Sequence, residues 1–347
     1  MFRRGIKFVK STFKWLLVGI FVYIFLTLVT PFVKPLRHSA IERQIAYLNQ
    51  QFESGLADKM QLVYPEGKLF SFAIFELSLI EYFQNSNNQE IRFLIDQNMN
   101  RMLNDSLEID FNQNLTPEYG AFYNGWMLWV MNEYLGLNDF NDPELLLRVK
   151  AKKDTLSINL LDSFCKLSGP LESHFSSVWP ADNLVAMAAL NVDYELSDFD
   201  GADIMRNFFN DEGEILHSLF EGENVRGSST ALSLYFLNQM KGLDCGQLTS
   251  NFRQKFVDNY FGVRLVKEYP DIGGEDFDSG PIIFGYGAVA SIVNVKLMTK
   301  IGENPYPTLC LFNLLGIPIS TWSYKFYLFG QEPMFDIFML WNFVSID

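Results

Sequence analysis

GAFYNGWMLWVMNEYL, residues 120–135, is the stretch that decides the fold expected for this chain. Apolar side chains occur around its whole circumference rather than along one stripe, and a helix that is hydrophobic on every side is buried on every side. Further segments of this kind begin near residues 67, 182, 228, 280 and 332. Segments with polar residues on one face alternate with them, near residues 40–54, 88–103, 144–166, 200–209 and 244–260. The pattern predicts buried inner helices, each paired with an outer helix.

The inner segments recur about every fifty residues, which is typical of a repeated helical hairpin. Six such hairpins could form an open solenoid, whose terminal repeats are normally polar, or could close into a ring. The last segment, EPMFDIFMLWNFV (332–344), is as apolar as the middle ones and favours closure. We therefore expect an all-α fold, an (α/α)6 toroid over residues 40–347, in which three prolines interrupt the last outer helix near residues 304–316.

The segment WLLVGIFVYIFLTLVTPFV, residues 15–33, carries no charge and is close to the ~20 residues that a helix needs to cross a bilayer. Five basic residues and no acids precede it, which favours a cytoplasmic N-terminus and an exported body. A cleaved signal peptide is the alternative, but Pro31 and Lys34 stand where small residues should mark a cleavage site. The sequence predicts a single-pass membrane protein with residues 1–14 cytoplasmic, a transmembrane anchor, and a periplasmic domain over residues 40–347.

The composition disfavours several classes of function. With 27 basic and 41 acidic residues the chain repels phosphate backbones, so no nucleic-acid partner is expected. Three well-separated cysteines build no disulfide framework, and only three histidines occur, so we expect no metal site and no cofactor. The chain has 33 phenylalanines, 15 tyrosines and 6 tryptophans, which indicates a compact interior and favours an aromatic-lined cavity.

Short polar loops precede the inner segments at equivalent positions. They read YPEG (64–67), TPEYG (116–120), WPAD (179–182), VRGSS (225–229), GGEDFDSGP (273–281) and GQEP (330–333). In a toroid the inner helices share a direction, so these loops would meet at one end of the central cavity. The rim expected there consists of Glu66, Glu118, Asp182, Arg226, Glu275, Asp276, Asp278 and Glu332. Polar groups that converge over an apolar pocket are typical of a binding or catalytic site.

Each rim residue also has a structural interpretation. Acids suit the first turn of a helix because of its dipole, and Asp182 is well placed to cap one. Arg226 could serve as a buried counter-ion among so many acids. GGEDFDSGP holds more acids than one cap requires, and its glycines permit close backbone approach, which favours a functional role for Asp276 and Asp278. Four aromatic residues near the rim belong either to the core or to a cavity wall: Tyr119, Tyr123, Trp126 and Trp179.

Taken together, these motifs resemble the bacterial linalool dehydratase/isomerases. The similar stretches are PEYGAFYNGWMLWVMNEYLG (117–136), WPADNLVA (179–186), RGSSTALSLYFLNQM (226–240), SNFRQKFVDNYF (250–261), GGEDFDSGPIIFGYGAVAS (273–291) and EPMFDIFMLWNFV (332–344). They look like that family's Tyr-x-Gly-His helix, Pro-Asp-Asn loop, fourth helical pair, Asp-Asp-x-Asp-Gly-Gly helix start and closing helix. The resemblance implies an (α/α)6 toroid, and it assigns Asp58 and Tyr64 to the chemistry by their spacing.

The chain departs from that family at the residues that carry its reaction. Trp126 stands where the family has a histidine, and Trp179 and Ala188 stand at about the positions of its two active-site cysteines. Without a thiol or an imidazole, acid–base work would fall to carboxylates and tyrosine. The resemblance therefore supports the fold, while the reaction has to be argued from the site itself.

These observations predict a membrane-anchored extracytoplasmic enzyme that performs lyase- or isomerase-type acid–base chemistry on a small apolar, isoprenoid or lipid-like substrate. The residues expected to be catalytic are Asp58, Tyr64, Asp182, Asp276 and Asp278. Those expected to bind substrate are Tyr119, Tyr123, Trp126, Trp179, Arg226 and Glu275. Two alternatives stay open: a carbohydrate-active hydrolase or lyase that binds a glycan, and a non-catalytic module that captures a ligand or partner at the bilayer.

Overall fold

The computed structural model of the chain describes residues 2–104, 107–174, 177–220, 224–270 and 280–346, with side chains from residue 13 onward. The protein is mainly helical, with 66% of its residues in helices, and the strands found in the described ranges are few and short. The prediction of a mainly helical fold is confirmed.

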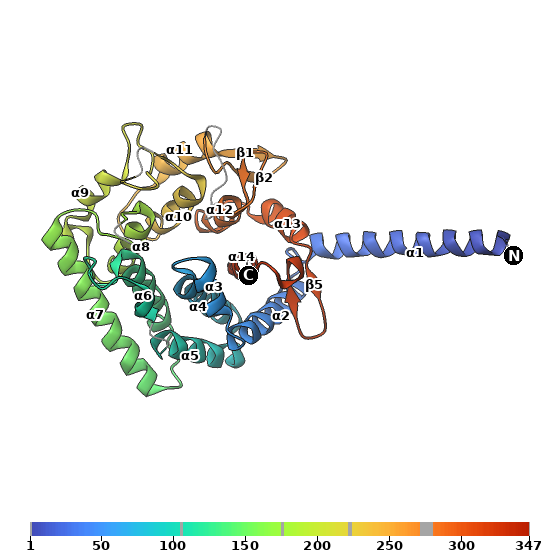
Figure 1. Ribbon diagram of the computed structural model, residues 1–347, viewed down its shortest axis with the longest axis horizontal. Coiled ribbons are helices and arrows are strands. Elements are labelled where there is room, and N and C mark those ends of the chain that lie inside the picture. The colour runs from blue at the N-terminus through green and yellow to red at the C-terminus, as the bar shows by residue number, and fades with distance from the viewer. Residues whose placement is uncertain (1, 105–106, 175–176, 221–223, 271–279, 347) are drawn as a thin grey trace.

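Six helices at the centre of the molecule form a ring (Figure 1). They are α4 (Gly67–Ser86), α6 (Gly120–Leu135), α8 (Pro180–Leu190), α10 (Gly227–Leu237), α12 (Ala288–Lys300) and α14 (Pro333–Ser345). Each packs against the next in chain order, and α14 returns to pack against α4. Five of the six begin within two residues of the positions that the apolar pattern predicts.

A second set of helices lies outside this ring. They are α2 (Lys34–Glu53), α3 (Leu56–Val63), α5 (Gln89–Asn104), α7 (Pro143–Leu167), α9 (Gly201–Met205), α11 (Gly246–Phe256) and α13 (Tyr306–Leu315). Short 3-10 helices accompany them: η1 (Leu107–Asp110), η2 (Leu196–Phe199), η3 (Arg206–Phe208) and η4 (Leu328–Gly330). Helices α5, α7, α11 and α13 pack against α4, α6, α10 and α12, and α2 packs against α14. Helices α2, α5, α7, α9 and α11 coincide with the segments of mixed polarity in the sequence, but residues 257–260 of the last segment form a strand, and α3 was not predicted.

Three antiparallel hairpins make up the strands of the described structure. They are β1 (Val257–Tyr260) with β2 (Val263–Val266), β3 (Ile282–Ile283) with β4 (Tyr286–Gly287), and β5 (Ile319–Ser320) with β6 (Lys325–Phe326). The second hairpin occupies the place where the sequence predicts an inner helix from about residue 280, so that boundary is wrong and α12 begins at Ala288. Positive φ angles at Phe284 (53°) and Gly285 (85°) form the two-residue turn that matches the twist of paired strands.

The last outer helix, α13, is regular in spite of its prolines. Pro305 stands at its N-cap and Pro307 in its first turn, where a backbone N–H has no partner within the helix. Pro318 follows the helix, whose C-cap is Gly316. The prolines therefore bound α13 instead of interrupting it.

The inner helices share one hydrophobic core. Every residue of α8 is buried, and α6 is open only in its last turn. These two helices approach closely at Gly125, because a Cβ atom there would lie 3.0 Å from the Cα atom of Ala186. Aromatic side chains of α4, α6, α10 and α14 also contact one another inside the ring, so a functional site has to be sought at the ends of the inner helices.

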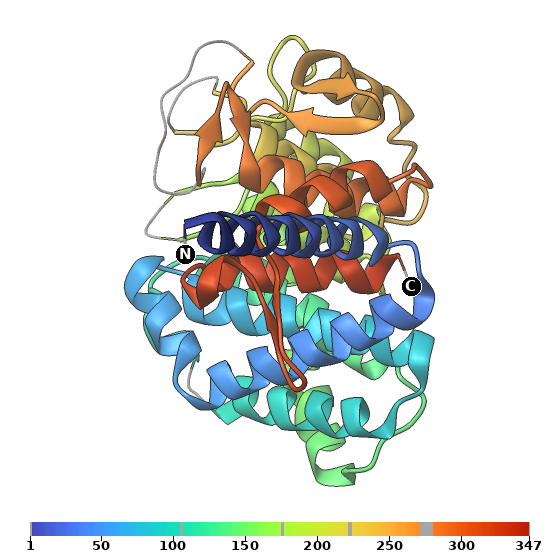
Figure 2. The ribbon, with the colours of Figure 1, turned by 90° about the vertical axis from the view of Figure 1, so that its right-hand side faces the viewer.

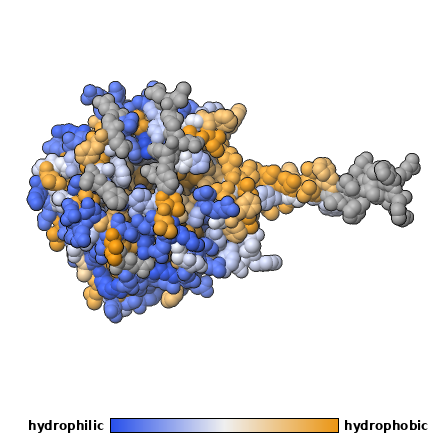
Figure 3. All heavy atoms as spheres, in the orientation of Figure 1, coloured by the Kyte–Doolittle hydropathy of each residue, from blue (hydrophilic) through white to orange (hydrophobic). Residues whose placement is uncertain are grey.

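Helix α1 (Phe2–Val29) projects from the side of the ring (Figures 1 and 2). Its side chains are exposed from Phe13 to Leu26 and form much of the apolar arm in Figure 3. No single helix in the described ranges is long and apolar enough to cross a membrane, although Phe13–Val29 and Lys34–Glu53, bent by 94° at their junction, meet the criterion together. The single-pass anchor therefore stays a prediction.

Candidate functional site

Buried charged groups occur at both ends of the ring. Residues from the C-terminal halves of α4, α6, α10, α12 and α14 line one pocket, so these inner helices run in the same direction. Their first turns, which follow the predicted rim loops, lie at the opposite end. We call these the last-turn end and the first-turn end of the ring.

Asp182 is one of several buried acids at the first-turn end, among them Asp336 in the first turn of α14. Asp182 lies in the first turn of α8, is only 7% exposed, and its Oδ2 atom has no hydrogen-bond partner among the described residues. Burial and the negative charge of Glu66 raise the pKa of Asp182 to about 8, although a hydrogen bond with Ser173 lowers it in part. Asp182 is therefore mostly protonated at neutral pH and can donate a proton.

Of the predicted residues on and next to α3 and α4, some lie near Asp182 and others lie at the surface. Glu66, at the N-cap of α4, is close enough to Asp182 to affect its pKa, as convergence of the loops predicts. Tyr64 ends α3 and is half-buried. Asp58 lies on α3 with its side chain 74% exposed, and one of its oxygens pairs with Lys68 Nζ at 2.9 Å. The structure brings Glu66 to Asp182 and leaves Asp58 in solvent.

Arg226, at the N-cap of α10, is the centre of a buried polar cluster. Its Nε atom donates to Oε1 of Glu268 at 3.0 Å, and its Nη1 atom lies 3.2 Å from Nε2 of His217. The hydroxyl of Ser228 donates to the same Glu268 oxygen at 2.6 Å. Arg226 is thus the counter-ion of a fully buried acid, the structural role that the sequence left open beside substrate binding. Sequence reasoning missed Glu268, which lies outside the rim loops.

Trp126 occupies the interior of the ring. It is fully buried, and its ring centroid lies 5.0 Å from that of Phe70 and 5.4 Å from that of Phe236. Phe70 also contacts Phe338 at 5.9 Å, and Phe338 contacts Trp341 at 6.2 Å. These five residues, which we call the aromatic layer, come from α4, α6, α10 and α14. The layer fills the space between the two ends of the ring.

The other predicted aromatic residues lie at the periphery. Tyr123 is buried against the outer elements, where its hydroxyl donates to Glu108 Oε2 at 3.3 Å and its ring centroid lies 5.5 Å from Lys152 Nζ. Tyr119 packs edge-on against Tyr123 at 5.5 Å. Trp179 is half-buried at the N-cap of α8. Glu275, Asp276 and Asp278 lie outside the described residues.

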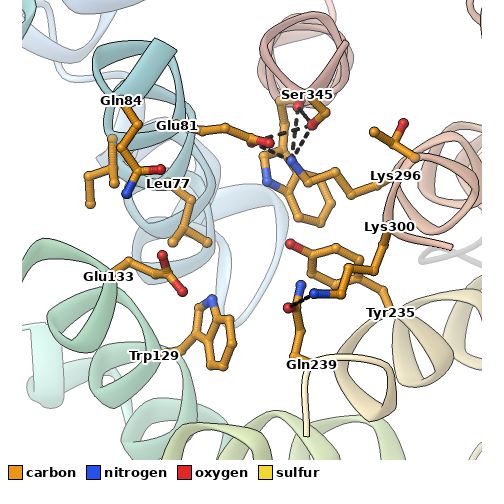
Figure 4. Close-up of a pocket in the computed structure, with 13 residues that line it drawn as sticks. Leu77, Glu81, Gln84, Trp129, Glu133, Tyr235, Gln239, Lys296, Lys300 and Ser345 are labelled. Carbon is orange, nitrogen blue, oxygen red and sulfur yellow. Dashed lines mark hydrogen bonds and ion pairs between the residues drawn. The ribbon is translucent and has the colours of Figure 1, made fainter. Parts of the chain in front are cut away.

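A pocket of about 250 Å³ opens at the last-turn end (Figure 4). The residues that line it are Leu77, Ile80, Glu81, Gln84, Trp129, Glu133, Tyr235, Gln239, Lys296, Thr299, Lys300, Trp341 and Ser345. Sequence reasoning missed this pocket. A signal was present, because Glu81, Glu133 and Lys296 each place a charge in the second half of a predominantly apolar inner helix.

Lys296 connects three inner helices inside this pocket. Its Nζ atom pairs with Glu81 Oε2 at 2.5 Å and donates to the hydroxyl of Ser345 and to the carbonyl oxygen of Trp341, the latter at 3.3 Å. The same atom lies 4.8 Å from the ring centroid of Trp341. Burial lowers the pKa of Lys296, while Glu81 raises it. The ion pair ties α12 to α4 and α14.

Glu133 is the second acid of the pocket and, unlike Glu81, is not paired with a lysine in Figure 4. Figure 4 shows its carboxyl group pointing into the cavity with no contact drawn to another lining residue, and the Tyr235 hydroxyl faces the same space. Burial and the charge of Glu81 raise the pKa of Glu133, while Lys296 and Lys300 lower it. Glu81 is held by its lysine, so the two carboxyl groups have unlike environments. Such a pair can divide the roles of acid and base.

Comparison with known proteins gives no family for this chain. No protein-family model matches it, and no curated protein matches it significantly. In the described parts of the chain, no three His, Cys, Asp or Glu side chains are grouped so that they could hold a metal ion. The function is therefore argued from the two ends of the ring.

Proposed function

We propose that the inner and outer helices form an (α/α)6 toroid, held at a membrane by α1, that carries out acid–base chemistry of the lyase or isomerase type on an apolar, lipid-like substrate. The return of α14 to α4 and the pairing of outer with inner helices support the toroid. The exposed apolar side chains of α1 support the anchor, and the five basic residues before it favour an extracytoplasmic body.

Asp182 is the observation that carries the proposed reaction. A carboxylic acid that stays protonated near neutral pH can transfer its proton to an alkene carbon or to the oxygen of a leaving alcohol. The buried surroundings that raise the pKa of Asp182 suit an apolar substrate rather than a charged one. After donation, the Asp182 carboxylate, with Glu66 beside it, is a base that can recover a proton from the substrate or from water.

Deuterium incorporation tests this proposal. Full-length protein in lipid nanodiscs would be incubated in D₂O with a panel of short isoprenoid alcohols and alkenes, and the products would be analysed by mass spectrometry. We expect exchange or elimination with the native protein and its loss in Asp182→Asn. Asp154→Asn, on the exposed face of α7, is the matched control. Asp182→Asn protein that turns over any of these compounds at the native rate would overturn the proposal.

A second candidate function rests on the pocket at the last-turn end. Glu133, with a raised pKa, and Glu81, held by Lys296, are an acid and a carboxylate in one cavity, as hydrolysis or elimination of a glycosidic bond requires. A panel of reducing-end-labelled oligosaccharides would test it, with Glu133→Gln compared against the exposed control Glu212→Gln. Cleavage that depends on Glu133 and not on Asp182 would favour this candidate over the first.

A further inference from the structure

Two segments far apart in the sequence share an absence of negative charge. Residues 1–41 contain no Asp or Glu, and neither do residues 304–331, in a chain with 41 acidic residues. The second segment contains α13 and the β5–β6 hairpin. Such long stretches without an acidic residue, in a chain that is otherwise acidic, point to a shared environment for the two segments.

The structure brings these two segments into contact. Helix α13 packs against α1, and Asn313 Nδ2 donates to the carbonyl oxygen of Thr27 at 2.7 Å. The ring of Tyr306 stacks on that of Phe32 with centroids 5.0 Å apart. Beyond α13, the hydroxyl of Tyr23 donates to the carbonyl oxygen of Pro318 at 3.3 Å. The acid-free segments therefore form one face around the base of α1.

Exposed aromatic residues stand at the turns of two hairpins beside this face. Trp322, in the β5–β6 turn, and Phe261, in the β1–β2 turn, are fully exposed. Gly262, next to Phe261, lies against Pro307 of α13, since a Cβ atom added there would be 3.3 Å from the proline ring. Figure 1 shows the β1–β2 and β5–β6 hairpins on either side of the base of α1.

We infer that this face, made of α13 with the β1–β2 and β5–β6 turns, rests on the lipid bilayer beside α1, with Phe261 and Trp322 in the headgroup region. The inference rests on the proposed anchoring of α1. Tryptophan is enriched at membrane–water interfaces because its ring is amphipathic. The absence of acids in α1, α13 and the β5–β6 hairpin removes from this part of the face the repulsion that anionic lipids would exert on the rest of this acidic chain.

Lipid is favoured over a second protein copy because the apolar surface is continuous. The exposed side chains of α1 run into this face without an intervening acid, and Leu315 and Ile317 extend them over the end of α13. A bilayer that surrounds α1 necessarily meets the body at this base. A protein partner would have to cover α1 and both turns together.

Site-directed spin labelling of the full-length protein in liposomes tests the inference. Exposed Cys165 is first replaced by serine, since the other two cysteines, Cys245 and Cys310, are buried. Nitroxide labels are then placed through Trp322→Cys and Phe261→Cys, and collision rates are measured with oxygen, which concentrates in lipid, and with a water-soluble nickel complex. Leu147→Cys, at an exposed apolar position of α7 across the ring from α1, is the matched control.

We expect the ratio of oxygen to nickel collisions at positions 322 and 261 to exceed that at Leu147→Cys several-fold. Ratios equal to the control would overturn the inference. A further label on α1, Phe21→Cys, distinguishes the failure of this inference from the failure of the proposed anchor. If the label at position 21 is exposed to lipid while those at positions 322 and 261 are exposed to water, α1 is an anchor but the face does not rest on the bilayer. Spin–spin broadening at position 322 that disappears on dilution with unlabelled protein would show that the face contacts a second copy of the chain, and this result would overturn the inference.

Discussion

At the first-turn end of the ring, Asp182 is a buried acid with Glu66 beside it and no cation among the groups that shift its pKa. At the last-turn end, Glu133 shares a pocket with Glu81, Lys296 and Lys300. The pKa of a buried carboxyl group is thus raised without an opposing cation at one end, and is raised against two opposing lysines at the other. An isolated buried acid suits proton donation, whereas a mixed cluster of acids and lysines suits a polar ligand and holds helices together.

The largest effect expected concerns the pH dependence at Asp182. Its folded-state pKa of about 8 is above the ordinary value of 3.8, so its contribution to stability is full below pH 4 and is lost as the pH rises toward 8. Asn cannot ionise. The free energy of unfolding of Asp182→Asn, relative to that of the native protein, should therefore increase by up to about 1.4 kcal/mol per pH unit across this window. Denaturant unfolding at several pH values measures the difference. A difference that is constant with pH would mean that Asp182 is ionised in the folded protein.

The buried ion pair of the first-turn end should come next. Arg226→Met leaves Glu268 charged and fully buried, which should lower the free energy of unfolding by about 3–5 kcal/mol. The double variant Arg226→Met, Glu268→Met should recover much of that loss, because no buried charge is left uncompensated. Thermal melting of both variants in the same detergent gives the comparison. A double variant no more stable than the single one would show that the cluster has a further role.

The corresponding change at the last-turn end should cost less. In Lys296→Met the remaining acid, Glu81, has a side chain that is one-third exposed and can be solvated, so we expect a loss of roughly 1–3 kcal/mol. The positive charge that lowers the pKa of Glu133 is also removed, so that pKa should rise further. Melting curves and a carboxyl titration by NMR with labelled Glu measure the two effects. If Lys296→Met loses as much free energy of unfolding as Arg226→Met, the two ion pairs do not differ in the way that their burial predicts.

The smallest effect lies away from both ends. Trp322→Ala should change the free energy of unfolding in detergent by no more than about 0.5 kcal/mol, because its ring is fully exposed and packs against no core residue. Thermal melting in detergent checks this value. A larger loss would mean that the β5–β6 turn contributes to folding.

The sequence predicts the framework well because buried helices have an unmistakable pattern. Helix α6 begins at Gly120 and α14 at Pro333, close to the positions read from their all-round apolar character. The start of α12 was missed because apolar β3 and β4 residues cannot be told from a helix without weighing the turn at Phe284 and Gly285. The prolines near α13 predict an interrupted helix, but Pro305 and Pro307 lie at its first turn, which tolerates them, and Pro318 follows its end.

The candidate site was predictable only in part. Asp182 and Glu66 follow from the shared position of the rim loops, and the structure brings them together. The pocket at the last-turn end was missed because Glu81, Glu133 and Lys296 are separated by long stretches of sequence, and only the closed ring makes them neighbours. Whether Trp126 belongs to core or cavity depends on its contacts with Phe70 and Phe236, which the sequence does not specify.

The contact of α14 with α4 has a consequence for the order in which the protein is made. The partners that Lys296 joins, Glu81 and Ser345, lie far apart in the chain, so the ring stays open until its last helix has been synthesised. Loop-closure entropy makes such long-range contacts slow to form. Until then the inner faces of the earlier helices are exposed to solvent. Biogenesis should therefore depend on holding chaperones during the interval between the emergence of α4 and that of α14.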